Sequence, residues 1–163
     1  MDKVKEFIKE NKWFLTVIIA AIAFRICFTP VTVKGHSMDN TLYDTEIGLV
    51  NKLDKSPARG DIVVATNPVS GDHIIKRVIG VPGDEIRSMD GYVYVNDRLL
   101  VEEYLDDSNK GVTYIDKEIV LGEGEYYLLG DNRQKSADSR KYGAYTRESL
   151  VGTWMFRVPL ISP

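Results

Sequence analysis

Cysteine is almost absent from this chain of 163 residues, which contains only Cys27. A single cysteine cannot form an internal disulfide, and no cluster of cysteines offers ligands for a structural zinc ion. The sequence therefore predicts neither a metal nor another cofactor, and the fold must be stable through packing alone. The lack of disulfides does not by itself identify the cellular compartment.

Histidine is nearly as scarce, with His36 and His73 as the two examples. His36 is next to Ser37, but neighbouring side chains of an extended chain point to opposite sides, which argues against an acid–base pair. We expect His73 to begin a strand at the surface. Two histidines without a clear carboxylate partner are also a weak pattern for a metal site.

The chain has no excess of basic residues, since its formal net charge is -3. Nucleic-acid binding is therefore not expected, because it usually requires a basic patch. Hydrophobic residues make up 44% and charged residues 28%, as in ordinary globular proteins. The length allows one domain with a substantial core and is too short for two large domains.

One long apolar run lies near the amino terminus. Residues 13–24 carry no charge, and apolar residues resume after Arg25 and continue to Phe28, before Pro30 would end a helix. This run lies just below the roughly 17–25 residues of a transmembrane helix. The sequence predicts an anchor at 13–28, between a short segment at 1–12 and a domain at 29–163.

The distribution of lysines predicts the orientation of this anchor. The lysines that precede it are Lys3, Lys5, Lys9 and Lys12. By the positive-inside rule, residues 1–12 lie in the cytoplasm, and the domain lies on the extracytoplasmic face of the cell membrane after a single pass. Two alternatives are a cleaved signal peptide, with Ala21-Ile22-Ala23 as its A-x-A site, and a buried helix of a soluble domain.

From residue 30 onward the pattern predicts a mostly β fold, a sandwich or barrel, with glycine-rich turns between short strands. The expected strands are Ile47–Val50, Asp61–Ala65, Ile74–Val81, Tyr92–Val95, Lys117–Leu121, Tyr126–Leu129 and Trp154–Val158. Residues 102–116 are polar and acidic, and we expect them to form an exposed loop. Residues 134–145 are expected to be irregular, with room for a short helical turn.

Lys76 is a candidate general base for a serine nucleophile, because lysine replaces histidine in some serine peptidases. Lysine is protonated at neutral pH, but burial among apolar groups lowers its pKa. On a strand, Lys76 shares a face with Ile74 and Val78. The alternative is a lysine that protects a strand edge from aggregation.

Four segments together resemble bacterial type I signal peptidases, in the short form typical of Gram-positive bacteria. Residues 34–42 resemble the nucleophile motif G-x-S-M-x-P-T-L, 59–64 the next motif, and 75–84 the motif of the lysine base. Residues 130–140 match the final box, G-D-N-R-x-x-S-x-D-S-R. Asn40 departs from the pattern, because the family usually has proline there, and proline would stiffen the turn.

The resemblance implies a Ser–Lys signal-peptidase fold of antiparallel sheets in a partial barrel, after one transmembrane helix. It makes Ser37 the nucleophile and Lys76 the base, with Ser136 orienting the lysine by a hydrogen bond. The other supporting residues implied are Asp138 and Arg140 as an ion pair, and Asp131, Arg133 and Gly130 as scaffold. The implied substrate-binding residues are Val31, Val33, Met38, Leu42, Val64, Ile74 and Ile75.

The resemblance also implies the partners. These are preproteins whose signal peptides end in A-x-A, the lipid bilayer, and a secretion translocon nearby. The signal peptide would bind as an added strand, with residues one and three before the cut facing the enzyme. A self-cleaving Ser–Lys protease of the phage-repressor type is excluded, because residues 1–29 cannot form a DNA-binding domain. A catalytically inactive relative, or an anchored peptide-binding module, remains as an alternative.

Overall fold

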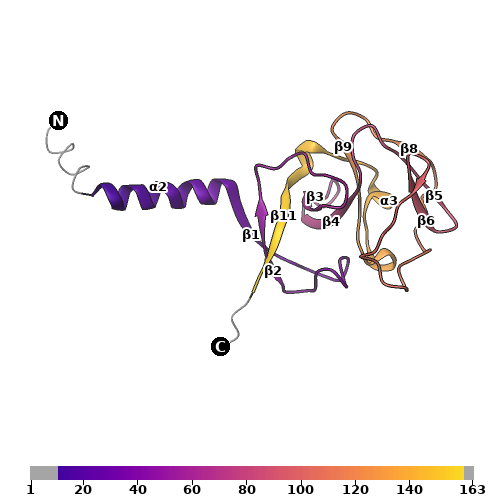
Figure 1. Ribbon diagram of the computed structural model, residues 1–163, viewed down its shortest axis with the longest axis horizontal. Coiled ribbons are helices and arrows are strands. Elements are labelled where there is room, and N and C mark those ends of the chain that lie inside the picture. The colour runs from indigo at the N-terminus through magenta and orange to yellow at the C-terminus, as the bar shows by residue number, and fades with distance from the viewer. Residues whose placement is uncertain (1–10, 160–163) are drawn as a thin grey trace.

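A computed structural model describes residues 11–159, so most of the predicted segment 1–12 lies outside the described residues. The first element is helix α2, Lys12–Cys27. None of its residues is buried, and Figure 1 shows it extending away from a β domain that contains the rest of the described chain. Within residues 11–159, no helix is both long enough and apolar enough to cross a membrane.

The domain contains two sheets whose strand pairs are all antiparallel. In spatial order, the first sheet contains β1 (Phe28–Thr32), β2 (Ile47–Asn51), β11 (Leu150–Val158), β3 (Ile62–Thr66), β4 (His73–Gly80), β9 (Glu125–Leu129) and β10 (Tyr145–Thr146). The second contains β7 (Arg98–Leu99), β6 (Tyr92–Val95), β5 (Glu85–Met89) and β8 (Ile119–Val120). The short helices are η1 (Arg133–Lys135), α3 (Ser139–Tyr142) and η2 (Arg147–Ser149). The mostly β prediction is confirmed.

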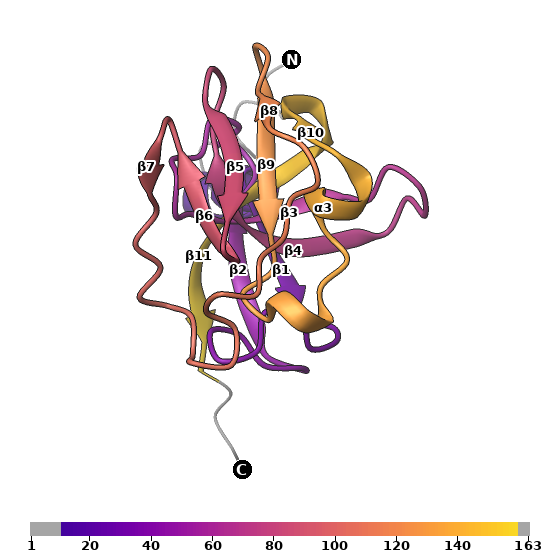
Figure 2. The same ribbon diagram turned by 90° about the vertical axis from the view of Figure 1, so that its right-hand side faces the viewer.

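The core follows from the alternation of side chains along the strands. On β4, Val78 packs with Val63 of β3 in one cluster, whereas Ile79 packs with Ile86 of β5 in another. The second cluster therefore joins the two sheets. Strands β5, β6 and β7 of the second sheet face the viewer in Figure 2. A third cluster, around Met38, lies beneath the region that the nucleophile motif occupies.

All seven predicted strands are present in part or in full, but β1, β5 and the two-residue strands β7 and β10 were not predicted. The prediction placed Phe28 at the end of the apolar span, whereas the helix ends at Cys27 and Phe28 begins β1. Pro30 lies within this strand and pairs with Leu49. Proline is tolerated there because β1 is at the edge of the sheet.

The junction between α2 and β1 contains no linker residues. Lys52 braces it, since its backbone N–H donates to the carbonyl oxygen of Cys27 at 2.8 Å and its Nζ to that of Arg25 at 2.8 Å. The rings of Phe24 and Phe28 also lie in contact across the junction, with centroids 5.0 Å apart. Helix and sheet are therefore joined directly.

The predicted loop at 102–116 is less exposed than the sequence indicated, in particular over its first part, residues 102–113. It contains no strand or helix, as expected, but Leu105, Asn109 and Thr113 are buried. Leu105 supplies apolar surface, while the two polar residues are held by specific hydrogen bonds. The acidic composition concealed this packing, because the partners of the loop come from distant parts of the chain.

Candidate active site

Ser37 lies on a tight turn that follows β1. This turn, the nucleophile turn, comprises Gly35–Leu42. The side chains of Met38 and Leu42 are buried and fix the turn to the core. Inside the turn, the N–H groups of Thr41 and Leu42 both donate to the carbonyl oxygen of Met38, at 3.0 and 2.8 Å. The turn thus holds Ser37 at the surface on a well-anchored backbone.

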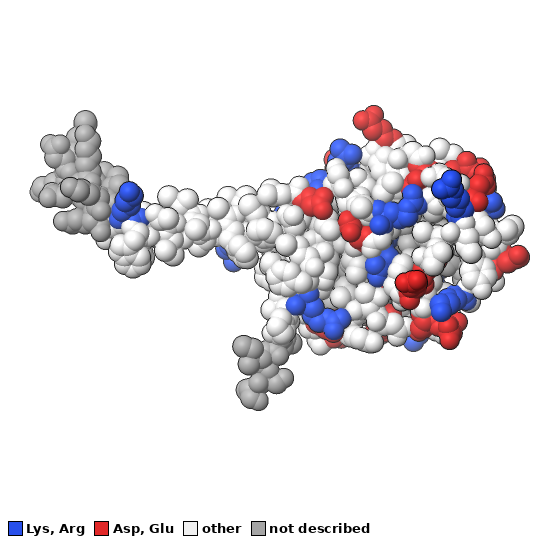
Figure 3. Space-filling model, viewed as in Figure 1, with Lys and Arg blue, Asp and Glu red and all other residues white. Residues whose placement is uncertain are grey.

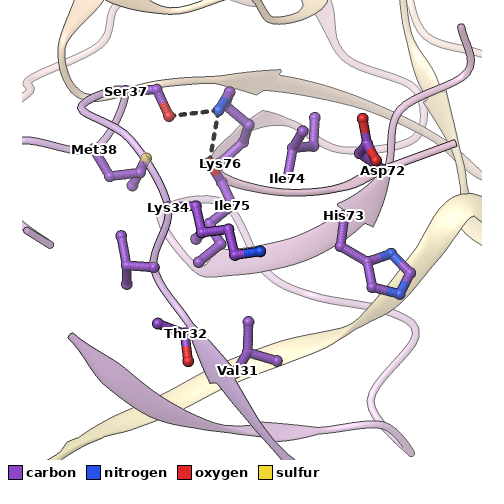
Figure 4. Close-up of a pocket in the computed structure, with 11 residues that line it drawn as sticks. Val31, Thr32, Lys34, Ser37, Met38, Asp72, His73, Ile74, Ile75 and Lys76 are labelled. Carbon is purple, nitrogen blue, oxygen red and sulfur yellow. Dashed lines mark hydrogen bonds between the residues drawn. The ribbon is translucent and has the colours of Figure 1, made fainter. Parts of the chain in front are cut away.

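Lys76, on β4, meets this serine. Its Nζ lies 2.7 Å from the Oγ of Ser37 and 2.8 Å from the carbonyl oxygen of Ile75 (Figure 4). Lys76 is only 3% exposed, because its neighbours on the same face of β4, Ile74 and Val78, belong to the apolar core. This arrangement brings together the nucleophile and the base that the sequence predicted.

The environment of Lys76 favours its neutral form. Burial lowers the pKa of the ammonium from 10.5 to about 8, although the nearby carboxylates of Asp138 and Asp131 oppose this shift. Arg140 also lowers the pKa. A lysine with this pKa is much better suited to accept a proton near neutral pH than an exposed lysine.

Asp138 and Arg140 lie together, as the resemblance implied. The Arg140 Nε donates to Oδ1 of Asp138 and its terminal nitrogen to Oδ2, both at 2.8 Å. Asp138 is fully buried and its Oδ2 also accepts the N–H of Gly130 at 3.1 Å. The ion pair therefore ties the helical turn α3 to the end of β9.

Asp131 has a partner that the sequence did not reveal. Its carboxylate accepts two hydrogen bonds from Arg77, at 2.9 and 2.6 Å, and one from the hydroxyl of Thr41 at 2.5 Å. The ring of Tyr104 stacks on the guanidinium of Arg77 at 3.9 Å. Asp131 thus connects the base-bearing strand with the nucleophile turn.

Arg133 is also buried, and it binds the loop at 102–113. Its guanidinium donates to the carboxylate of Glu102 and, at 2.6 Å, to the hydroxyl of Thr113. Its Nε donates to the carbonyl oxygen of Gly130 at 3.1 Å. Asp131 and Arg133 therefore belong to two separate ion pairs, rather than pairing with each other.

The structure does not show the hydrogen bond from Ser136 to Lys76. The Oγ of Ser136 is buried and has no hydrogen-bond partner among residues 11–159. It lies beside Gly130, where an added Cβ would come within 2.3 Å of this oxygen and 2.4 Å of the Ser37 carbonyl oxygen. The orienting role of Ser136 remains a prediction, while Gly130 is required for this close approach.

The histidines lie near the site without contacting the serine hydroxyl. The Nδ1 of His36 is 3.2 Å from a carboxylate oxygen of Asp39, and the His36 side chain is mostly exposed. His73 is exposed at the start of β4, at the rim of the pocket (Figure 4). The residue that hydrogen-bonds Ser37 Oγ is thus Lys76.

A pocket of about 490 Å³ opens beside Ser37 and Lys76. Five of the seven predicted substrate-binding residues line it, namely Val31, Val33, Met38, Ile74 and Ile75. The other two, Leu42 and Val64, do not line it and instead belong to the buried cluster around Met38. Their apolar character reflects core packing.

Sequence reasoning missed the contacts that hold the site together. Arg77, Thr41, Glu102 and Tyr104 were not assigned, because their partners lie up to 90 residues away in sequence. The adjacent Lys76-Arg77 pair was the one available signal, since two successive cations on a strand rarely lie inside a core. No group of histidine, cysteine and carboxylate side chains among residues 11–159 could hold a metal ion.

In this domain of antiparallel sheets, the hydroxyl of Ser37 is hydrogen-bonded to the amine of Lys76, which is almost fully buried. The chain matches the family described as signal peptidase, peptidase S26, over residues 4–159. It therefore belongs to the signal peptidase family and is a peptidase of the S26 class.

Individual relatives agree with this assignment. The chain is 37% identical to signal peptidase I U of Bacillus subtilis, over 93% of this chain and 88% of the relative. It is 35% identical to signal peptidase I of Streptococcus pneumoniae, over 97% and 96%. A crystal structure of a signal peptidase I from Enterococcus faecalis superimposes with a TM-score of 0.52 at 31% identity, covering 60% of this chain and 95% of that one.

Proposed function

We propose that the protein is a membrane-attached serine endopeptidase that removes signal peptides from exported preproteins, with Ser37 as nucleophile and Lys76 as general base. The observation that carries this proposal is the 2.7 Å contact between the Ser37 hydroxyl and a lysine amine that is almost fully buried. The experiment that tests it is cleavage of a preprotein after its A-x-A sequence by the purified full chain. An intact substrate would refute the proposal.

The chemistry follows from this pair. Neutral Lys76 accepts the hydroxyl proton as Ser37 Oγ attacks the scissile carbonyl carbon, and the backbone N–H of Ser37 would stabilise the oxyanion. The lysine then donates that proton to the leaving amine as the C–N bond breaks, which leaves an acyl-enzyme. Water, deprotonated by Lys76, attacks the ester and releases Ser37 and the carboxylate product.

The edge of β4 offers a place for the substrate backbone. Residues 73–77 pair with β3 on one side, whereas pairing with β9 on the other side begins only at Arg77. Positions 73–76 therefore keep a free edge beside the nucleophile among the described strands. An extended peptide can add to such an edge through backbone hydrogen bonds.

The side chains around the free edge explain a preference for small residues. Val31, Met38, Ile74 and Ile75 form apolar walls, and both Met38 and Ile75 are buried and packed. Residues one and three before the cut point to the same side of an extended peptide. Alanine fits against these walls, while a bulky side chain would have to displace packed core residues.

The pKa of Lys76 predicts the pH dependence of cleavage. Since the base must be neutral, kcat/KM should rise as pH increases through about 8, the lowered pKa of Lys76. The measurement is the acid limb of the kcat/KM profile of the wild type and of His36→Ala and His73→Ala. The limb should be unchanged in both variants. A limb near pH 6.5 that disappears in either one would indicate imidazole instead.

We also propose that α2 attaches the protein to a lipid bilayer. Figure 3 shows α2 as a projecting rod that is mostly free of charged side chains, and Trp13, Ile19 and Ile22 are more than half exposed. A helix of 16 residues is about 24 Å long, compared with a hydrocarbon core of about 30 Å. Local thinning of the bilayer accommodates such a difference at modest cost.

The orientation has a direct test. With residues 1–12 in the cytoplasm and residues 29–163 outside, protease added to wall-stripped intact cells should degrade the β domain. Degradation of the β domain only after the cells are lysed would contradict this topology. Amino-terminal sequencing distinguishes an anchor from a cleaved signal, since cleavage after Ala23 would give Phe24 as the first residue.

A further inference from the structure

Asn40 gives the nucleophile turn a backbone that proline could not form. Its φ is +77°, in the left-handed region, which asparagine tolerates better than most residues. Proline is restricted to a φ near −65°. The turn after Ser37 in this protein is therefore built differently from a turn with proline at position 40, and something other than a pyrrolidine ring must hold it.

The side chain of Asn40 makes a specific contact with the loop at 102–113. Its Nδ2 donates to Oδ2 of Asp106. The other oxygen of that carboxylate, Oδ1, accepts from the hydroxyl of Ser108 at 2.8 Å and from the backbone and side-chain nitrogens of Asn109, both at 2.9 Å. Each oxygen of Asp106 thus has its own partners, and Asn40 is the partner of Oδ2.

The loop that carries Asp106 is itself fastened to the final box. Glu102 pairs with buried Arg133, and the side-chain amide of Gln134 donates to the carbonyl oxygen of Ser108 at 2.6 Å. Leu105 is buried beside Asp106. The loop therefore offers Asn40 a fixed support, which is itself part of the framework around Lys76.

We infer that Asn40 is a positioning residue, which holds the nucleophile turn on the loop at 102–113 through Asp106 and so keeps Ser37 aligned with Lys76. The inference rests on the proposed Ser–Lys function. Asn40 lies three residues after Ser37, inside the turn that the Thr41 and Leu42 N–H groups close. Because Asn40 is exposed, its loss removes this tie without opening a cavity in the core.

Single substitutions should weaken catalysis in a graded order. Asn40→Ala loses the hydrogen bond, and kcat should fall about tenfold, since small misplacements of reacting groups are costly. Asn40→Asp places two carboxylates in contact, and kcat should fall about 100-fold. KM and the acid limb near pH 8 should change little, because neither the pocket nor Lys76 is altered.

Restoring the residue typical of the family should not help. Asn40→Pro must change φ from +77° to about −65°, which breaks the turn that Thr41 and Leu42 close. Its kcat should fall at least as far as that of Asn40→Asp. A proline variant as active as the wild type would show that the turn does not depend on this backbone.

An exchange of the two side chains gives the sharpest test. In the double variant Asn40→Asp, Asp106→Asn, the new amide at 106 can donate to the new carboxylate at 40, while its Oδ1 still accepts from Ser108 and Asn109. Because the contact between positions 40 and 106 is restored, we expect kcat to recover to within about threefold of the wild-type value. The matched control is Asn40→Asp, Asp107→Asn, which has the same composition and charge but changes an exposed carboxylate that pairs with Lys110.

Hydrogen exchange separates this inference from the proposed function. The N–H groups of Thr41 and Leu42 should exchange faster in Asn40→Asp and regain protection in the exchanged variant, whether or not the chain cleaves a preprotein. Rescue of both kcat and protection supports the inference. Equal behaviour of the two double variants, or single variants that behave as the wild type, would overturn it, even in a fully active enzyme.

Discussion

Replacing Ser37 or Lys76 by alanine should abolish cleavage, with a loss of at least about 10³-fold in kcat, because a nucleophile and its base act as one unit. Lys76→Arg should be equally inactive. Arginine keeps the charge and could approach the same hydroxyl, but its guanidinium does not lose a proton in proteins and cannot act as a base. The measurement is turnover of a preprotein by each full-length variant in detergent.

A matched control shows that the loss is specific. Lys110 is an exposed lysine that pairs with Asp107, and Lys110→Ala should leave turnover unchanged. The thermal unfolding of the Ser37→Ala variant should match that of the wild type, since its hydroxyl is partly exposed. Substantial turnover by Lys76→Ala or Lys76→Arg would remove the lysine from its assigned role and leave the serine without a base.

Asp131→Ala should lower the free energy of unfolding by about 3–5 kcal/mol, because it leaves the Arg77 guanidinium buried without its carboxylate. The side chains of this pair are 11% and 1% exposed. The control is Asp97→Ala, whose carboxylate pairs with Arg87 but is 78% exposed. That variant should lose less than about 1 kcal/mol. Denaturant unfolding followed by fluorescence measures both, and similar losses would contradict the prediction.

The same carboxylate gives a second readout through the base. Asp131 raises the pKa of Lys76, so Asp131→Asn removes a charge that stabilises the ammonium. The pKa of Lys76 should therefore fall, and the acid limb of the kcat/KM profile should move to lower pH. A limb that stays in place or moves upward would show that Asp131 acts on stability alone.

The sequence predicted most of the strands, because short runs of β-branched and aromatic residues between turn residues are a local property. It failed at β1, where Phe28 and Pro30 continue an apolar run and resemble the end of a helix. What distinguishes them is pairing with β2, about 20 residues later, which a local pattern does not contain.

The close approach of Ser37 and Lys76 was predictable, because sequence motifs single out these two residues. The framework was less predictable, because it depends on pairs such as Arg77 with Asp131, which are 54 residues apart. Composition was misleading in the loop at 102–113, since Glu102 is acidic and yet nearly buried. Such a residue looks solvent-exposed until its cationic partner is known.

If α2 is held in a bilayer as proposed, its direct junction with β1 would limit how far the peptidase domain can reach. A domain on a flexible tether would sweep a wide volume and meet scissile bonds at many heights above a bilayer. Here Lys52 and the contact of Phe24 with Phe28 restrain rotation at the base of the domain. With α2 held in the membrane, Ser37 would stay at a nearly constant height above the bilayer surface. Only peptide bonds presented at that height would be cut. The fixed distance between Ser37 and the bilayer would thus select the cleavage position, independently of the residues that the pocket recognises.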